Sequence, residues 1–226
     1  MPASPGFDAS AFPGLVPMTW LKNNTNLVWC GYYLGAANTS HPGTDWLGQR
    51  AALVALGYGL APLYVGEQEP TAPVLGNKNP SAAKGTLDGA QAIALMHGEG
   101  FPVGTTVYLD VEDGSLSPLM QGYVGAWIDA FNGQDFSPGV YCSHLIAAAV
   151  VALRPATAPR IWAFKLTTQT GGPLGGTNFP TQDPSGCGYP ADAWQWAQQC
   201  QLNLPGTPVN HLVVDLSTAI TPDPGG

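Results

Sequence analysis

Three carboxylates lie within four positions at the end of one hydrophobic segment. The stretch VYLDVEDG, residues 107–114, carries Asp110, Glu112 and Asp113 in a chain that has only 15 acidic residues. Like charges at this spacing repel each other, so a substrate, a metal ion or exposure to solvent must offset the repulsion. Carboxylates in unequal environments support acid–base catalysis such as glycoside hydrolysis, where one acid is protonated and its partner ionised.

The three carboxylates do not suit this chemistry equally. Asp113 precedes Gly114, which is typical of a turn residue. Glu112 is the better candidate for a proton donor, because it has the longer side chain and lies beside two Asp residues whose charges favour its protonated form. Asp110 is two positions away, so in a strand both side chains point the same way.

Short β-rich segments and helical patterns alternate along the chain and must position these residues. The expected strands are residues 6–10, 27–34, 59–66, 105–112, 139–143, 160–166, 193–197 and 211–217. Helical spacing of apolar residues covers residues 44–56, with Thr44 or Asp45 as its cap, residues 80–100, residues 115–133 and the segment SHLIAAAVVAL. After the sixth strand, residues 167–190 are rich in Gly and Pro and have no helical period, and residues 198–210 are too short for a full helix.

This order predicts an α/β fold of one domain over residues 1–226. Eight strands alternating with helices indicate a (β/α)8, TIM-like barrel, degenerate in its last third, where loops replace helices. The alternative, a doubly wound open sheet, lacks a glycine fingerprint after its first strand.

In such a barrel the active site forms at the carboxyl ends of the strands. Asp8 ends the first expected strand, Asp110 and Glu112 the fourth, and Asp215 the eighth. Strands one and eight are neighbours in a closed barrel and strand four faces them, so we expect the four carboxylates to converge. Any one Asp alone is better explained as a helix cap or turn residue, but four such residues at one rim favour a catalytic interpretation.

Aromatic residues in the expected strands are candidates for stacking on sugar rings. The candidate substrate-binding residues are five aromatic residues and one amide: Tyr33, Tyr64, Tyr141, Trp162, Trp194 and Gln195. The alternative for each aromatic residue is a place in the core. Trp194 and Trp196 share a strand face, so either these or Gln195 between them point inward.

The composition argues against several classes of function. A net charge of −8 with only seven Lys and Arg is unsuited to nucleic acid. No apolar run approaches the ~20 residues of a membrane span. The four His residues show no zinc-ligand spacing, and GxSxG and phosphate-binding glycine motifs are absent. We therefore expect no cofactor and no metal, with an oxygen-only Mg²⁺ or Ca²⁺ site as the remaining alternative.

The four cysteines help to predict the cellular compartment of the protein. A Cys187–Cys200 bond would close an irregular loop, whereas Cys30 and Cys142 lie in apolar strand-like segments typical of buried thiols. Few Lys, many Gly and Pro, and such a disulfide favour a secreted, periplasmic or cell-envelope protein. The first residues, MPASPGFD, show no signal peptide.

In order along the chain, GFDAS, YLDVE, GVYCS, IWAFK, WQWA and VVDLS resemble the landmark motifs of glycoside hydrolase family 25 lysozymes. More closely, the chain resembles the DUF1906 group of glycoside-hydrolase-like domains found in exported bacterial proteins. The lysozymes are (β/α) barrels that cut peptidoglycan between N-acetylmuramic acid and N-acetylglucosamine.

The resemblance implies roles for particular residues. DVE makes Glu112 the acid and Asp110 its partner, and GFD and VVD place Asp8 and Asp215 in the same cluster. Tyr141 and Gln195 resemble substrate-lining positions. Lys165 stands where the lysozymes usually have a polar or aromatic residue, and Trp196 where they have Tyr. Both departures alter substrate contacts, so another glycan is an alternative substrate.

We therefore expect a muramidase-like glycoside hydrolase acting on peptidoglycan or a related N-acetylated glycan, with Glu112 as general acid/base. Two alternatives remain. One is a glycan-binding or cell-envelope module on the same barrel without catalysis, and the other is a hydrolase with a carboxylate-bound divalent metal.

Overall fold

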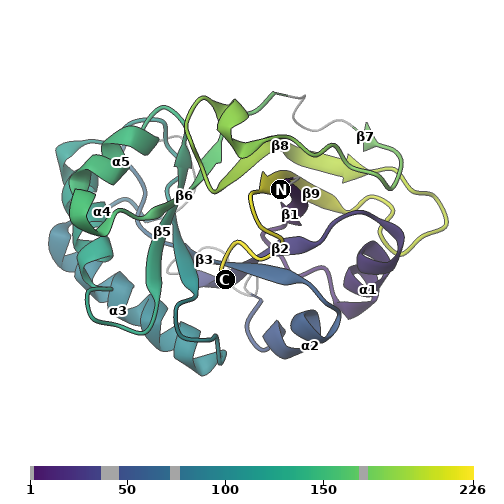
Figure 1. Ribbon diagram of the computed structural model, residues 1–226, viewed down its shortest axis with the longest axis horizontal. Coiled ribbons are helices and arrows are strands. Elements are labelled where there is room, and N and C mark those ends of the chain that lie inside the picture. Colours follow the sequence, from purple (N-terminus) through teal and green to yellow (C-terminus); the bar gives the residue numbers. More distant parts are fainter. Residues whose placement is uncertain (1–2, 37–45, 72–76, 168–172) are drawn as a thin grey trace.

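Eight strands close into a barrel in the computed structural model, which describes residues 3–36, 46–71, 77–167 and 173–226 (Figure 1). The sheet order is β6-β5-β4-β3-β2-β1-β9-β8-β7, and a further pairing of β6 with β8 closes the ring. The strands are β1 (Ser4–Asp8), β2 (Trp29–Ala36), β3 (Gly59–Val65), β4 (Thr106–Asp110), β5 (Ser137–Ser143), β6 (Arg160–Phe164), β7 (Pro173–Leu174), β8 (Ala193–Leu202) and β9 (Val213–Ala219). The expected TIM-like, single-domain fold is confirmed, and the two-residue β7 lies outside the ring on β8.

The last strand runs against the others. β9 pairs antiparallel with both β1 and β8, whereas β1 to β6 pair in parallel. The connection from β8 to β9 is too short for a helical crossover, and a short connection joins antiparallel strands. Our expectation that Asp215 ends its strand is therefore wrong. It is the third residue of β9, and it reaches the rim because β9 begins there, with Asp215 directly opposite Asp8.

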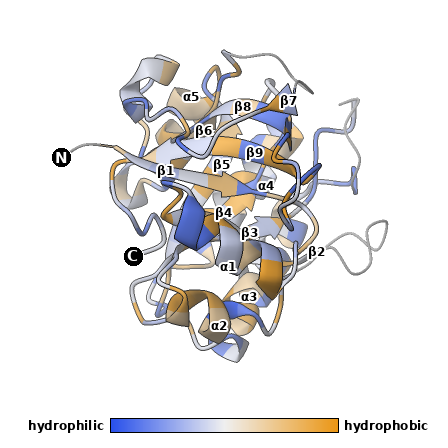
Figure 2. Cartoon of the chain, turned by 90° about the vertical axis from the view of Figure 1, so that its right-hand side faces the viewer, coloured by the Kyte–Doolittle hydropathy of each residue, from blue (hydrophilic) through white to orange (hydrophobic). Residues whose placement is uncertain are grey.

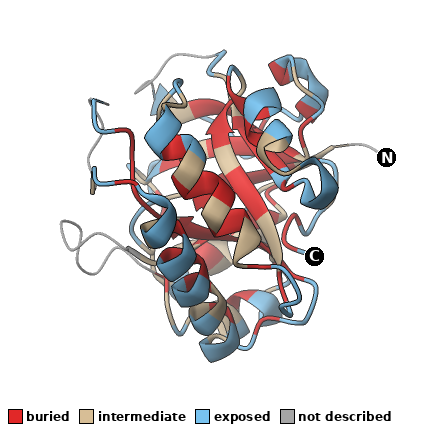
Figure 3. Cartoon of the chain, turned by 90° about the vertical axis from the view of Figure 1, so that its left-hand side faces the viewer, coloured by how far each residue is buried: buried red, intermediate tan, exposed pale blue. Residues whose placement is uncertain are grey.

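Helices cover one side of the barrel more completely than the other. They are α1 (Leu15–Asn24), α2 (Arg50–Ala55), α3 (Ala82–Gly98), α4 (Pro118–Asp129) and α5 (Ala147–Leu153). α3, α4 and α5 lie together outside β3 to β5 (Figure 1), with buried residues toward the sheet and exposed ones toward solvent (Figure 3). α1 and α2 lie on the opposite side (Figure 2). Beyond β6, loops, β7 and a short 3-10 helix at Pro184–Cys187 replace helices, as expected for the last third.

Local sequence explains where the long helices begin. Ser81 and Ser117 accept hydrogen bonds from backbone N–H groups in the first turns of α3 and α4. The two helices approach closely at Gly85, where a Cβ would lie 2.2 Å from the carbonyl oxygen of Tyr123. α1 was not expected, and α2 begins only at Arg50. The proposed caps Thr44 and Asp45 lie outside the described residues.

The barrel interior holds its own apolar cluster. Its members are Trp29, Ala61, Leu63, Tyr108, Trp162, Ala193 and Ala219. The Trp162 ring meets Trp29, Tyr108 and Tyr141 edge to face, with centroids 5.3, 5.9 and 5.2 Å apart. A second, larger cluster fills the space between the strands and the surrounding elements. Side chains therefore fill the interior, and the strand-end acids lie at its rim.

The cysteines do not cross-link the chain. All four are buried free thiols, so the Cys187–Cys200 bond is not formed. Within the described ranges, the helices are all too short or too polar to cross a membrane.

Candidate active site

Four carboxylates from three strands and one loop meet at a single cavity. Asp8 is the last residue of β1, Asp110 the last of β4, and Asp215 lies in β9 opposite Asp8. Glu112 follows β4 by two residues. All four line a cavity of about 510 Å³, so the structure brings together the acids that the sequence placed at one rim.

Asp8 and Asp110 are the buried members of the cluster, each with 4% of its surface exposed. Tyr33 donates its hydroxyl proton to Asp8 Oδ1 at 2.9 Å. Among the described residues, Asp8 Oδ2 and Asp110 Oδ1 are buried without a hydrogen-bond partner. Burial raises the pKa of both carboxyls well above its ordinary value, and the charges of Asp215 on Asp8 and Glu112 on Asp110 raise it further. Burial and the neighbouring charges therefore both favour the neutral form of these two carboxyls.

Asp215 differs from these two carboxyls in its pKa and in its hydrogen bonds. Burial raises its pKa to about 6, although hydrogen bonds from the Gln199 N–H (2.6 Å) and Gln195 Nε2 (3.1 Å) favour its ionised form. Gln195 Oε1 in turn accepts from the Tyr141 hydroxyl at 2.7 Å. Gln199 lies at an irregularity in β8 with a positive φ of 51°, which turns its N–H toward Asp215. Asp215 is thus the carboxylate of the cluster that ionises just below neutral pH.

Glu112 is exposed, in contrast to its partner Asp110. Its backbone is fixed even though it lies beyond the strand. The Glu112 N–H donates to Gln68 Oε1 at 2.9 Å, and Gln68 Nε2 donates to the Asp110 carbonyl oxygen at 2.9 Å. On the other side the Val111 N–H donates to the carbonyl oxygen of Tyr141 at 2.9 Å. Asp110 and Glu112 are therefore a close pair in unequal environments, as acid–base catalysis requires.

Gln68 belongs to a buried polar segment, Glu67 to Glu69, that follows β3. Glu67 accepts a hydrogen bond from the Asn79 N–H at 2.9 Å. This bond joins the start of the loop after β3 to the residues just before α3. Glu69 accepts one from the N–H of Ser117, the cap of α4. Gln68 and Glu69 thus hold the two ends of the loop that carries Glu112.

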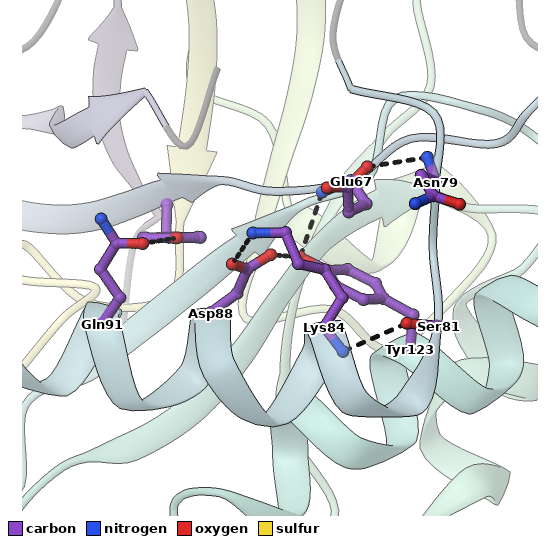
Figure 4. A network of polar contacts seen from close by, with 8 residues as sticks. Glu67, Asn79, Ser81, Lys84, Asp88, Gln91 and Tyr123 are labelled. Carbon is purple, nitrogen blue, oxygen red and sulfur yellow. Dashed lines mark hydrogen bonds and ion pairs between the residues drawn. The ribbon is translucent and has the colours of Figure 1, made fainter. Parts of the chain in front are cut away.

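A polar network anchors this segment to the helices behind it (Figure 4). The Glu67 N–H donates to the Tyr123 hydroxyl at 3.1 Å, and that hydroxyl donates to Asp88 at 2.7 Å. Lys84 forms an ion pair with the same buried carboxylate at 2.6 Å. The loop after β3 is therefore fastened to both α3 and α4.

The cavity extends past the acids into a second hollow. That hollow, about 520 Å³, is bounded by the start of β9, Gln199 and the residues after β1. The two hollows share Asp8, Tyr33, Glu112, Gln198 and Asp215. We call the first the β5–β6 lobe and the second the β9 lobe. Asp8, Glu112 and Asp215 therefore lie where the two lobes meet, and Asp110 lines the β5–β6 lobe alone.

Comparison with known proteins identifies the family. The family model described as "Rv2525c-like, glycoside hydrolase-like domain" matches residues 20–211. The chain belongs to this family. A search of curated protein sequences finds no match. The expected resemblance to glycoside-hydrolase-like domains is confirmed by the family match.

Solved structures share the fold of this Rv2525c-like domain. The Tat-secreted protein Rv2525c of Mycobacterium tuberculosis is similar, with a TM-score of 0.62, 16% identity and coverage of 98% of each chain. The catalytic domain of endolysin ply40 from a Listeria monocytogenes bacteriophage has a TM-score of 0.61 and 14% identity, over 97% of this chain and 94% of its own. The Cpl-1 endolysin, solved with a peptidoglycan analogue, has a TM-score of 0.52 and 10% identity, over 96% of this chain and 54% of its own.

The predicted substrate-binding residues divide between the cleft and the outer layers. Tyr33, Tyr141, Trp162 and Gln195 line the β5–β6 lobe. Tyr64 and Trp194 do not line either lobe.

Tyr64 and Trp194 lie outside the cleft because successive side chains of a strand point to opposite faces of the sheet. Leu63 faces the interior, so Tyr64 faces α3, where its hydroxyl donates to Gln91 at 2.8 Å. Gln195 points inward, so Trp194 points outward and its Nε1 donates to the Lys165 carbonyl oxygen at 2.9 Å.

The residues that sequence reasoning missed are amides. Gln68 holds the Asp110–Glu112 turn, and Gln198 lines both lobes. The only available signal for Gln68 was a run of three polar residues, EQE, directly after an apolar strand. In the described ranges, groups of three or more His, Cys, Asp or Glu arranged to hold a metal ion are absent.

Proposed function

We propose that this Rv2525c-like domain is a glycoside hydrolase that cuts bacterial cell-wall peptidoglycan, with Glu112 as the general acid/base. The observation that carries the proposal is the position of Glu112. It is the exposed carboxylate between two lobes, paired with the buried Asp110 and held by a buried amide. A proton donor must reach the glycosidic oxygen, and a second carboxyl in a different environment must lie close to the same bond.

The neighbouring carboxyls take complementary roles. Asp215, whose pKa lies at about 6, supplies negative charge at neutral pH to stabilise an oxocarbenium-like transition state. Asp8 and Asp110, whose pKa values burial raises, form hydrogen bonds with polar groups of the sugar, such as those of an N-acetyl group. Their unpaired buried oxygens support this role, since a buried polar atom without a partner is costly until a ligand satisfies it.

The proposed substrate and location agree with the neighbours. The Cpl-1 endolysin was solved with a peptidoglycan analogue, and the Mycobacterium tuberculosis relative is Tat-secreted. We accordingly place the activity at the cell envelope or outside the cell.

The first test is release of reducing sugar ends from purified peptidoglycan by the wild-type protein and by Glu112→Gln. The amide is nearly isosteric but cannot donate the catalytic proton, so we expect turnover to fall by about 100-fold or more. Unfolding curves for both proteins check that the fold is intact. Co-sedimentation with peptidoglycan and no sugar release by wild type would contradict the proposal and support a glycan-binding module.

A further inference from the structure

A separate pocket lies at the opposite end of the barrel from the acid cleft. Its volume is about 390 Å³, and none of the residues that line it lines either lobe of the cleft. Leu60 at the start of β3, Thr105 just before β4 and Asp223 beyond the end of β9 all line it. Because β9 runs against the other strands, its end lies beside the starts of β3 and β4, whereas the acids lie where β1 and β4 end. A pocket of this volume is large enough for a small molecule.

Arg50 supplies a cation to this pocket. Its guanidinium lies over the ring of Phe101, 4.9 Å from the ring centroid. Among the described residues, Arg50 forms no ion pair, and its Nε is buried without a hydrogen-bond partner. A buried donor without an acceptor costs free energy until an acceptor reaches it, so this N–H favours a ligand that brings one.

Hydrogen bonds and ring contacts fix the position of this cation. The backbone N–H of Arg50 donates to the Tyr32 hydroxyl at 3.2 Å, and the Phe101 N–H donates to the Met96 carbonyl oxygen of α3 at 3.0 Å. The rings of Tyr32 and Phe101 meet edge to face with centroids 5.5 Å apart. Since the guanidinium meets the ring from above, its N–H groups remain free to bind an anion in its own plane.

The other lining residues limit which anion fits. Val54 and Val103, 47% and 77% exposed, line the pocket with Pro102 and provide an apolar surface. Asp223 Oδ1 accepts a hydrogen bond from the Leu60 N–H at 2.9 Å, and this carboxylate repels a second negative charge in the same pocket. A monoanion is therefore favoured over a phosphate dianion, and a carboxylate matches the planar fork of a guanidinium.

We propose that this pocket binds a small organic carboxylate with an apolar body, and that Arg50 is its anion-binding residue. The carboxylate accepts hydrogen bonds from the guanidinium, including the buried Nε–H, and the apolar body lies against Val54 and Val103. The inference is independent of the proposed function, because the pocket and the acid cleft have no lining residue in common.

The test compares two probes of nearly the same shape, 4-methylpentanoate and its neutral amide, in NMR titrations of the wild-type protein. We expect the acid to bind about tenfold more tightly than the amide, since a hydrogen bond to a charged group contributes about this much. Two glycine amides report the location: the Gly104 signal in the pocket should shift, and the Gly114 signal in the acid cleft should not. Inorganic phosphate, a third probe, should bind more weakly than the acid.

Arg50→Gln should bind both probes with the affinity that wild type has for the amide, and Arg50→Lys should keep part of the preference for the acid. Arg154→Gln is the matched control, because it makes the same charge change in an exposed ion pair with Asp129 and should bind as wild type. The wild-type comparison needs no substitution, so the test remains valid even if a variant fails to fold. Equal binding of acid and amide, binding of neither, tighter binding of phosphate, or a shift of Gly114 in place of Gly104 would overturn the inference.

Discussion

At the scale of single residues, the acid cluster combines carboxyls in different environments. Burial raises the pKa of Asp8 and Asp110 well above its ordinary value, and neighbouring acidic residues raise it further. Asp215 has two donors, from Gln195 and Gln199, and ionises at about pH 6. Such separation of pKa values is what allows neighbouring carboxyls to act as proton donor and anion in one reaction.

The raised pKa values predict that the cluster costs stability at neutral pH. Asp215 has a folded-state pKa of about 6 against an ordinary value of 3.8, so its favourable contribution is complete below 3.8 and is lost as pH rises through 6. That difference corresponds to about 3 kcal/mol, from which a lost hydrogen bond subtracts about 1 kcal/mol. Asp215→Asn should therefore raise the free energy of unfolding by about 2 kcal/mol at pH 8, with little gain at pH 4, as measured by urea denaturation.

Asp129 provides a control of opposite sign. Its hydrogen-bonded ion pair with Arg154 lowers its pKa, so Asp129→Asn should reduce stability at pH 8, although little because the pair is exposed. A loss of stability at pH 8 in Asp215→Asn as well would show that its ionised form is favoured in the folded protein.

At the scale of elements, the loop after β3 determines where the catalytic loop lies. Gln68 bridges the Asp110 carbonyl and the Glu112 N–H, and Glu69 holds the Ser117 N–H at the start of α4. Because Gln68 is fully buried, its two hydrogen bonds leave the Asp110–Glu112 turn little freedom. Gln68 acts through Glu112 and is a positioning residue.

Gln68→Ala should therefore lower kcat for sugar release about 10- to 100-fold with little change in KM, since a displacement of about 1 Å in a catalytic group costs this much. Steady-state kinetics on soluble peptidoglycan fragments measure the two constants. Gln91→Ala is the control, because the exposed Gln91 accepts a hydrogen bond from Tyr64 of β3 on the α3 side, away from the cleft. Equal losses in both variants would mean that the effect of Gln68 is general destabilisation.

The elements also show what the sequence allowed us to predict. The eight barrel strands and the four acids follow from local patterns, since apolar alternation and strand-end carboxylates are visible in short segments. The short connection before β9 was visible in the sequence, but the antiparallel direction that it implies was not predicted. Whether Tyr64 and Trp194 point into the barrel or away from it depends on strand register, because a shift of one residue moves a side chain to the opposite face. Gln68 could not be assigned, because its partners lie more than 40 positions away.

At the scale of the whole molecule, the site joins two unlike halves of the barrel. The half behind β3 to β5 is backed by α3, α4 and α5, and it carries Asp110 and Glu112 (Figure 1). The other half, formed by β8, β9 and loops, carries Gln195 and Asp215. Pairing of β6 with β8 closes the ring between these halves, so the site depends on that closure.

Trp162 on β6 lies at this closure. Its ring meets aromatic rings from β2, β4 and β5, its Nε1 donates to Ser217 of β9 at 3.2 Å, and it also lines the β5–β6 lobe. The same side chain therefore fills the interior and forms the floor of the cleft. Removing it should affect both stability and ligand binding.

Trp162→Ala should lower the free energy of unfolding by about 3–5 kcal/mol, the usual cost of deleting a large buried aromatic side chain, and should abolish glycan binding in whatever protein remains folded. Trp162→Phe keeps a ring in the interior and should lose less stability. Trp20→Ala, on the partly exposed face of α1, is the control and should cost much less. Urea denaturation and calorimetry measure the two effects. If Trp162→Ala loses stability but still binds the glycan, the ligand contacts only residues at the rim of the cleft. Trp162 would then support the fold without contacting the ligand.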